Sequence, residues 1–261
     1  MNEKPGKIPW EVTRRGFLKT LGAAGIGVAA ASAVESIVGA APTAATDSET
    51  HQWAFVIDLR KCDGCEECTK ACQATHALAK DQRWINVYKI KNSTGTEFFM
   101  PRLCMQCENP PCLRVCPTGA TYAGRDGVVL VDQNLCIGCR TCMAACPYEA
   151  RYFNWKEPPT PLKPVAQTMP EFPVPQKKGT VGKCILCVHY ANQGKLPACV
   201  DACSMEALYI GDMTTDVATN GHETVKLSKF LRDNDAVHFR EELGTRPRVW
   251  YIAGHGQKLD Y

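Results

Sequence analysis

Cysteine is the residue with the clearest chemical potential in this 261-residue sequence, which contains 16 of them. They are not scattered along the chain but form four sets of four, with none left over. Thiolates bind zinc and iron–sulfur clusters, and thiols pair as disulfides in oxidising compartments. The sets are Cys62, Cys65, Cys68 and Cys72; Cys104, Cys107, Cys112 and Cys116; Cys136, Cys139, Cys142 and Cys146; and Cys184, Cys187, Cys199 and Cys203.

The spacing within the sets favours iron–sulfur clusters. The first and third sets read C-x2-C-x2-C-x3-C, which is the spacing of bacterial ferredoxins. The second and fourth sets lengthen the middle of the same pattern. Structural zinc sites usually use two separated ligand pairs, and a disulfide framework has no reason to repeat this rhythm. We therefore predict four [4Fe–4S] clusters, with a structural zinc or disulfide protein without a redox role as the alternative.

The order of the sets along the chain predicts how they pair. In two-cluster ferredoxins the fourth cysteine of one motif ligates the cluster of the other motif. The second and third sets would form an inner pair, and the first and fourth sets an outer pair into which the inner one is inserted. The predicted ligand groups are Cys104, Cys107, Cys112 and Cys146; Cys136, Cys139, Cys142 and Cys116; Cys62, Cys65, Cys68 and Cys203; and Cys184, Cys187, Cys199 and Cys72.

Small and rigid residues accompany the cysteines. Gly64 and Gly138 lie between the first two cysteines of their sets, where glycine permits a tight loop that aims backbone N–H groups at sulfur. Pro117 and Pro147 follow the fourth cysteine of the two inner sets and can redirect the chain there. We interpret His76 and His189, near the outer loops, as partly exposed surface histidines, with a hydrogen bond to a cluster sulfur or proton transfer as the alternative role.

The elements that must position these loops indicate an α+β fold of two interleaved bacterial-ferredoxin-like units with loop-rich extensions. Alternating apolar residues predict a strand within 51–62, a hairpin within 81–104 and a short hairpin between the inner sets. We expect an amphipathic helix over 224–243 and a closing strand in 246–254. The expected parts of the 46–261 domain are an outer half (50–100 and 180–215), an inner half (101–155), a proline-rich arm (156–179) and a C-terminal extension (216–261).

The N-terminus carries an expected export signal in residues 1–45. Arg14 and Arg15 precede a weakly apolar run from Leu21 to Val34, which is too short to cross a bilayer. An adjacent arginine pair before a short Gly/Ala-rich core resembles a twin-arginine signal. That route carries folded proteins, so it favours a cofactor inserted before export. We expect a periplasmic protein, or one on the outer face of the cytoplasmic membrane.

Other function classes find little support in the sequence. The net charge of +3 is small, and no basic stripe interleaved with aromatic residues is present, which argues against a nucleic-acid partner. There is no nucleophile elbow, phosphate-binding glycine loop or carboxylate pair. We expect no catalytic residues. The proline-rich arm and the segment after Gly211 exceed what four clusters require, so we expect them to dock onto a partner.

With its motifs in place, the chain resembles the electron-transfer subunits of the complex iron–sulfur molybdoenzymes, such as dimethyl sulfoxide, polysulfide and tetrathionate reductases. The resemblance covers about residues 50–255 and includes "CENPPCLRVCPTGA", "DGVVLVDQNLCIGCRTCMAACPY", "KCILC" and "GTRPRVWYI". Within this family, "CMAACPYEARYFNW" and the export signal look most like the DsrO type, from the DsrMKJOP membrane complex of dissimilatory sulfur metabolism.

The resemblance implies a relay of single electrons through four [4Fe–4S] clusters. It also implies an NrfD-type integral membrane partner that handles quinones, and a multihaem cytochrome c subunit close by. Contact with the membrane would then come through partners. The alternative is the same fold serving an exported molybdopterin oxidoreductase.

Overall fold

The computed structural model describes residues 50–92, 95–159 and 175–254. Residues 47–261 form one compact unit. The expected export signal and the middle of the proline-rich arm lie outside the described residues. None of the helices in the described part of the chain is long and apolar enough to cross a membrane.

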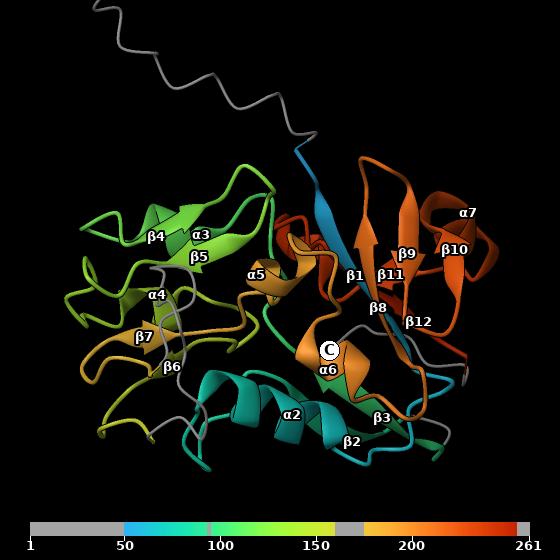
Figure 1. The fold of residues 1–261 in the computed structure, drawn as a ribbon, viewed down its shortest axis with the longest axis horizontal. Helices are drawn as coiled ribbons and strands as arrows, with labels where there is room; N and C mark the ends of the chain where they lie inside the picture. The colour runs from blue at the N-terminus through green and yellow to red at the C-terminus, as the bar shows by residue number, and fades with distance from the viewer. Residues whose placement is uncertain (1–49, 93–94, 160–174, 255–261) are drawn as a thin grey trace, which may run out of the picture. The chain divides into compact units, whose positions relative to one another are not determined.

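A six-stranded sheet combines two strands of the outer half with four strands of the C-terminal extension, so that extension is part of the fold (Figure 1). Its strand order is β10-β9-β8-β1-β12-β11. At its centre β1 (Trp53–Asp58) pairs antiparallel with β8 (Leu208–Asp212) and parallel with β12 (Val249–Ile252), so the two ends of the domain meet in one sheet. The predicted first and closing strands are confirmed.

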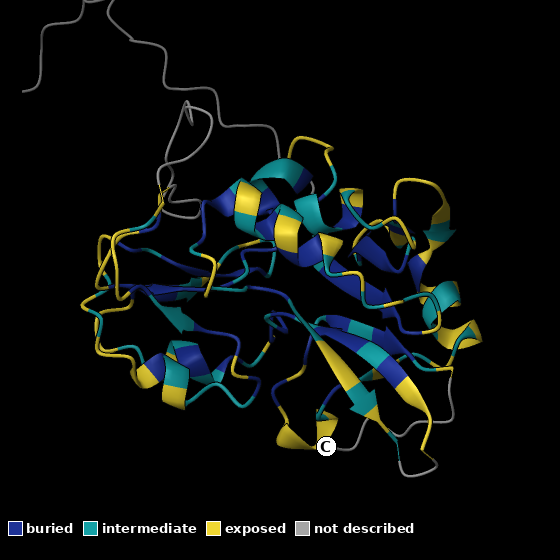
Figure 2. Ribbon diagram, turned by 90° about the horizontal axis from the view of Figure 1, so that it is seen from below, coloured by how far each residue is buried: buried dark blue, intermediate teal, exposed yellow. Residues whose placement is uncertain are grey.

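The central strand is apolar on both faces because it separates two cores. Successive side chains of a strand point to opposite faces. Phe55 and Ile57 face the larger core, which also contains many of the cysteines. Ala54 and Val56 face a smaller core with Leu227. Figure 2 shows buried strands inside the molecule and exposed residues mainly along its edges.

The segment predicted as one helix over 224–243 is instead a series of short elements. They are β10 (Thr224–Lys226), α7 (Leu227–Asp233), β11 (Val237–His238) and the 3-10 helix η1 (Glu241–Leu243); β10 pairs with β9 (Val217–Thr219). The backbone N–H and hydroxyl of Ser228 both donate to the Asp216 carboxylate at the start of α7. Asp235 adopts a left-handed conformation (φ 47°), which no helix continues through. The prediction was wrong because sheet pairing overrode the amphipathic pattern.

The cysteines lie on or beside short helices. Only α2 is longer than one turn among the five: α2 (Glu67–His76), α3 (Pro111–Arg114), α4 (Thr141–Ala144), α5 (Val188–Ala191) and α6 (Ala198–Asp201).

Three hairpins complete the fold. The predicted hairpins are present as β2 (Asn86–Lys91) with β3 (Glu97–Arg102), and β4 (Thr121–Ala123) with β5 (Val129–Val131). A third pair, β6 (Tyr152–Phe153) with β7 (Val181–Gly182), was not expected. It joins the two ends of the proline-rich arm, so the arm begins and ends at one place. In Figure 1 the β4–β5 and β6–β7 hairpins lie with α3 and α4, apart from the large sheet.

Candidate metal centres in four cysteine-lined cavities

The structure brings the sixteen cysteines together in four cavities, each lined by four thiols. In every cavity three cysteines come from one set and the fourth from another. We name them A to D. Cavity A is lined by Cys62, Cys65, Cys68 and Cys203; cavity B by Cys72, Cys184, Cys187 and Cys199; cavity C by Cys104, Cys107, Cys112 and Cys146; and cavity D by Cys116, Cys136, Cys139 and Cys142.

The cavities fit a cluster better than a single ion. All sixteen thiols are free. In the described part of the chain no three His, Cys, Asp or Glu side chains close on one point as a zinc site requires. Each quartet instead surrounds a space of its own. Four separate spaces lined by four thiols each fit four cysteine-ligated [4Fe–4S] clusters.

The four loops share one backbone conformation. The residue before the second cysteine of each set has a positive φ, at Gly64 (82°), Gln106 (46°), Gly138 (71°) and Leu186 (55°). This conformation turns the chain so that the first two cysteines face the same cavity. The predicted roles of Gly64 and Gly138 are therefore confirmed, and Gln106 and Leu186 adopt the same turn without glycine.

Close packing adds a second requirement at the two glycines. A Cβ on Gly64 would lie 2.4 Å from the Phe99 ring. A Cβ on Gly138 would lie 2.2 Å from the carbonyl oxygen of Gly179. Each loop is thus held against a neighbouring segment, which for Gly138 is the returning end of the arm.

Burial keeps several of the cysteine thiols protonated. It raises the pKa of Cys62 and Cys184 to about 11, and that of Cys68, Cys107 and Cys187 to about 12. These thiols stay protonated at neutral pH unless a metal takes the place of the proton. Assembly of a thiolate-bound centre here must therefore release protons.

Hydrogen-bond donors surround the sulfurs. The backbone N–H groups of Leu186, Ala207 and Thr121 lie 3.4–3.5 Å from the sulfurs of Cys184, Cys203 and Cys116. Side chains also contact sulfur. Two of them are buried: Arg151 Nη2 donates to Cys112 at 3.0 Å, and His76 Nε2 lies 3.4 Å from Cys187. The hydroxyls of Thr141 and Thr118 lie 3.5 Å and 3.7 Å from the sulfurs of Cys139 and Cys116. Such donors tune the potential of a cluster.

His76 and Arg151 depart from what the sequence suggested. His76 is only 1% exposed, so its interpretation as a surface histidine was wrong. Burial, with a smaller effect from His189, lowers the pKa of His76 to about 3, and the ring is therefore neutral. Arg151 is 4% exposed. The sequence did not indicate a functional role for it, because an arginine is normally expected at the surface.

The cavities form a row in the order A, B, C, D. Helix α2 carries Cys68 of cavity A and Cys72 of cavity B one turn apart. Between B and C, the charge of Cys104 acts on the Cys184 thiol and raises its pKa further. Between C and D, the charge of Cys112 acts likewise on Cys142.

A buried amide and a buried ammonium join the middle of the row. The Gln106 side chain accepts from Val129 N–H at 2.9 Å and donates to the Cys184 carbonyl at 2.9 Å. Lys183, 1% exposed, donates from Nζ to the same carbonyl at 2.6 Å. These contacts fix the outer loop at cavity B to the inner half. The sequence showed no signal for either residue beyond its nearness to a cysteine.

Both ends of the row reach the surface. Cys65 in cavity A and Cys139 in cavity D are exposed, whereas the eight cysteines of cavities B and C are buried or half-buried. Electrons can therefore enter or leave at A and D, while the two middle centres are shielded from solvent.

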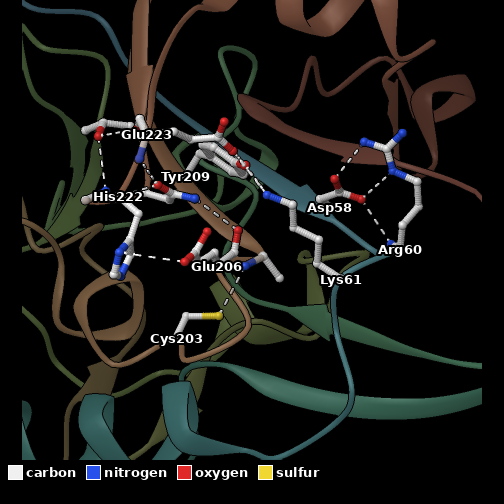
Figure 3. A network of polar contacts seen from close by, with 12 residues as sticks. Asp58, Arg60, Lys61, Cys203, Glu206, Tyr209, His222 and Glu223 are labelled. Atoms are coloured by element: carbon white, nitrogen blue, oxygen red, sulfur yellow. Dashed lines mark hydrogen bonds and ion pairs between the residues drawn. The ribbon is translucent and has the colours of Figure 1, made fainter.

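Charged side chains lie beside cavity A, in the network of polar contacts drawn in Figure 3. Lys61, next to Cys62, donates from Nζ to the Tyr209 hydroxyl at 2.7 Å and to Glu223 at 3.1 Å. Tyr209 also donates to Glu223. These hydrogen bonds, with the charge of Lys61, lower the pKa of Glu223.

Large apolar side chains are exposed beside cavity D. Leu135, Ile137 and Trp155 are 53%, 67% and 64% exposed, and we call them the apolar patch. The Arg140 guanidinium lies 4.8 Å from the centre of the Trp155 ring, and Arg140 and Ile137 both line cavity D. An exposed apolar group of this kind marks an interaction site.

The chain matches known iron–sulfur proteins over most of its length. Two family models, both described as a 4Fe-4S dicluster domain, match residues 96–160 with 163–213, and residues 61–120. One subunit of the selenate reductase of Mesobacillus selenatarsenatis is 40% identical over 77% of this chain and 72% of its own length.

Two further relatives align over nearly the whole chain. One subunit of the tetrathionate reductase of Salmonella typhimurium is 33% identical over 94% of this chain and 90% of its own length. The Hdr-like menaquinol oxidoreductase iron-sulfur subunit 1 of Archaeoglobus fulgidus is 32% identical over 94% of this chain and 100% of its own length. With its four cysteine-lined cavities, this chain therefore belongs to the family of iron–sulfur electron-transfer subunits of molybdoenzyme-type reductases, with four [4Fe–4S] clusters as its cofactors.

Proposed function

We propose that the protein is a DsrO-type relay that passes single electrons between a quinone-handling membrane subunit and other redox subunits of a respiratory complex of sulfur metabolism. The observation that carries this proposal is the row of four cavities, each lined by four cysteines, with an exposed cysteine at each of its two ends. Such a row has two docking ends, as a relay between two partners needs.

The proposal includes the ligands of each cluster. Four thiolates hold each [4Fe–4S] cluster, and the four lining each cavity are the set assigned to it. The support for this assignment is that each cavity is lined by cysteines from two different sets. Cys146 lies with Cys104 in cavity C, and Cys116 lies with Cys136 in cavity D, as expected from the exchange of fourth ligands in two-cluster ferredoxins.

The membrane partner docks at cavity D. An integral subunit of the NrfD type presents apolar surface near the bilayer, and the apolar patch is the complementary face on this chain. The proline-rich arm leaves the fold at Trp155 and returns to it at Gly179, beside Gly138 of the same cavity. We therefore place the docking surface at the patch and at the described ends of the arm. One relative is named a menaquinol oxidoreductase subunit, which agrees with a quinone-handling partner.

The opposite partner docks at cavity A, where the surface is charged. A hydrophilic redox protein, for which a multihaem cytochrome c is our candidate, would meet the ion pair of Lys61 and Glu223 there. Charged rims of this kind steer and orient transient redox partners.

The proposed location is outside the cytoplasmic membrane, reached by the twin-arginine route. The arginine pair at 14 and 15 supports it. Two relatives align over 94% of this chain. Residues 46–261 make up less than 94% of the chain, so these alignments must also include part of residues 1–45.

Purification of the native complex tests the partner assignment. The double variant Leu135→Gln/Ile137→Gln should lose most of its co-purification with a quinone-reactive membrane subunit while its iron content stays unchanged. The matched control Val237→Gln/Leu243→Gln, at positions 40% and 45% exposed elsewhere on the surface, should still co-purify. A wild-type preparation that instead brings down a molybdopterin subunit and no cytochrome would favour the molybdoenzyme alternative.

A further inference from the structure

Arg151 is a buried cation with no carboxylate partner among the described residues. It lies five residues after Cys146, the last cysteine of the third set, and directly before β6. Its Nη2 donates to the Cys112 sulfur at 3.0 Å, and its Nη1 donates to the Thr121 hydroxyl at 3.1 Å. A guanidinium that is only 4% exposed needs a compensating negative charge. The hydrogen-bond partner that can provide one is a cysteine sulfur.

The charge of Arg151 acts on two cavities at once. Cys112 and Cys104 line cavity C, and Cys142 lines cavity D. Burial lowers the pKa of Arg151, but these three thiols outweigh it and raise the pKa above its usual value. Arg151 also acts on Cys142. Burial raises the pKa of that thiol, and the charge of Arg151 partly offsets this increase. The guanidinium therefore lies between the two inner centres and stays protonated.

The outer pair is arranged differently. There His76 contacts the Cys187 sulfur, and it is neutral and supplies a dipole in place of a charge. The Thr69 side chain, which is also uncharged, hydrogen-bonds to Cys68. The charges that act on Cys68 and Cys72 all belong to other thiols. Lys183 does act on Cys184, but its ammonium donates to the backbone carbonyl of that residue and not to its sulfur.

A thiolate-ligated [4Fe–4S] cluster is an anion whose negative charge grows when it accepts an electron. A fixed cation nearby therefore stabilises the reduced form more than the oxidised form and raises the reduction potential. A cation between two such clusters raises both potentials. It also offsets the repulsion that a reduced cluster exerts on its neighbour.

We propose that Arg151 is a shared tuning residue for the two inner clusters, raising both of their reduction potentials and allowing both to be reduced together. One electron arrives from a donor at one end of the row and leaves to an acceptor at the other, and Arg151 keeps its proton throughout. The inner pair is then where electrons reside. This inference rests on the ligand assignment of the proposed function, which iron content reports separately.

Redox titration of the whole protein, followed by electron paramagnetic resonance, tests the inference. Arg151→Gln should shift the potentials of two clusters downward and leave two unchanged. Arg151→Lys, which keeps the charge, should restore most of the shift. The two shifted clusters should be the pair perturbed by Cys146→Ser and Cys116→Ser. An unchanged titration, a shift of one cluster only, or an equal shift of all four would overturn the inference.

A milder variant keeps the test open if Arg151→Gln does not retain iron. Thr121→Val removes the hydroxyl that anchors Nη1 and leaves the charge and the backbone N–H to Cys116 in place. It should lower the same two potentials by a smaller amount at full iron content. Thr118→Val is the matched control, because its hydroxyl lies 3.7 Å from the Cys116 sulfur and does not contact Arg151; it should affect at most one cluster. Full iron content with no shift in Thr121→Val would contradict the proposal.

Discussion

The carbonyl oxygen of Gly179 occupies the space that a side chain on Gly138 would need. A Cβ on Gly138 would lie 2.2 Å from that oxygen and 3.1 Å from the Phe153 ring. Gly138 turns the loop of cavity D, and Gly179 ends the proline-rich arm. The terminal centre and the arm are therefore packed against each other through two glycines.

This contact predicts a sharp cost for Gly138→Ala. The left-handed conformation alone costs a non-glycine residue about 1–2 kcal/mol. The backbone overlap adds to that cost and should displace the loop. We expect loss of one cluster and a lower melting temperature, measured by iron content and thermal unfolding.

Gly194→Ala is the control for this prediction. Gly194 has a similar φ of 69°, but none of the described residues lies within 4 Å of its Cβ position. The Gly194→Ala variant should be destabilised only by the cost of the left-handed conformation, and it should keep all its iron. If the two variants had the same iron content and melting temperature, the contact between Gly138 and Gly179 would not contribute to stability or cluster binding.

The sequence predicted the cofactors and the fold class because both depend on local patterns. The x2-x2-x3 spacing and its two longer variants indicate cluster-binding thiols, and the comparisons confirm four [4Fe–4S] clusters and a dicluster fold. The hairpin at 86–102 was found because its apolar alternation is long. The two-residue strands of β6 and β7 were missed because so short a segment shows no period.

What the sequence could not show depends on tertiary burial. Arg151 and Lys183 resemble surface residues until the fold encloses them, and their partners are distant in the chain. Leu186 adopts the loop turn that glycine marks elsewhere, so its role carried no compositional signal. The order of the cavities also required the structure, since only contacts place Cys104 beside Cys184.

Exchange of the fourth ligands predicts which cluster a substitution disturbs. Cys146→Ser should alter the spectrum of the cluster held by Cys104, Cys107 and Cys112, because its side chain lines cavity C. Cys116→Ser should alter the other inner cluster. Electron paramagnetic resonance of the two variants reports each change. Loss of the Cys136 cluster in Cys146→Ser would mean that each set holds its own cluster.

Removal of the middle of the arm should affect docking and not folding. The pairing of Tyr152 with Gly182 holds the two ends of the arm together whether or not residues 160–174 are present. A variant in which a short Gly/Ser linker replaces residues 160–174 should keep its iron and bind the membrane subunit more weakly. Co-purification measures the binding. A variant without iron or folded protein would place the arm within the fold.

Export should depend on both arginines of the N-terminal pair. Replacing Arg14 and Arg15 with lysines removes the feature that the twin-arginine route reads, while the charge is kept. Cluster-loaded protein should then accumulate in the cytoplasm, as measured by cell fractionation with brown colour as the marker. Continued export of the variant would point to another route.

The iron and acid-labile sulfide content of protein prepared without oxygen tests the central claim most directly. Four [4Fe–4S] clusters on sixteen thiolates predict about sixteen iron and about sixteen sulfide atoms per chain. A reproducible content near half of that, in protein whose cysteines are all reduced, would contradict the four-cluster relay.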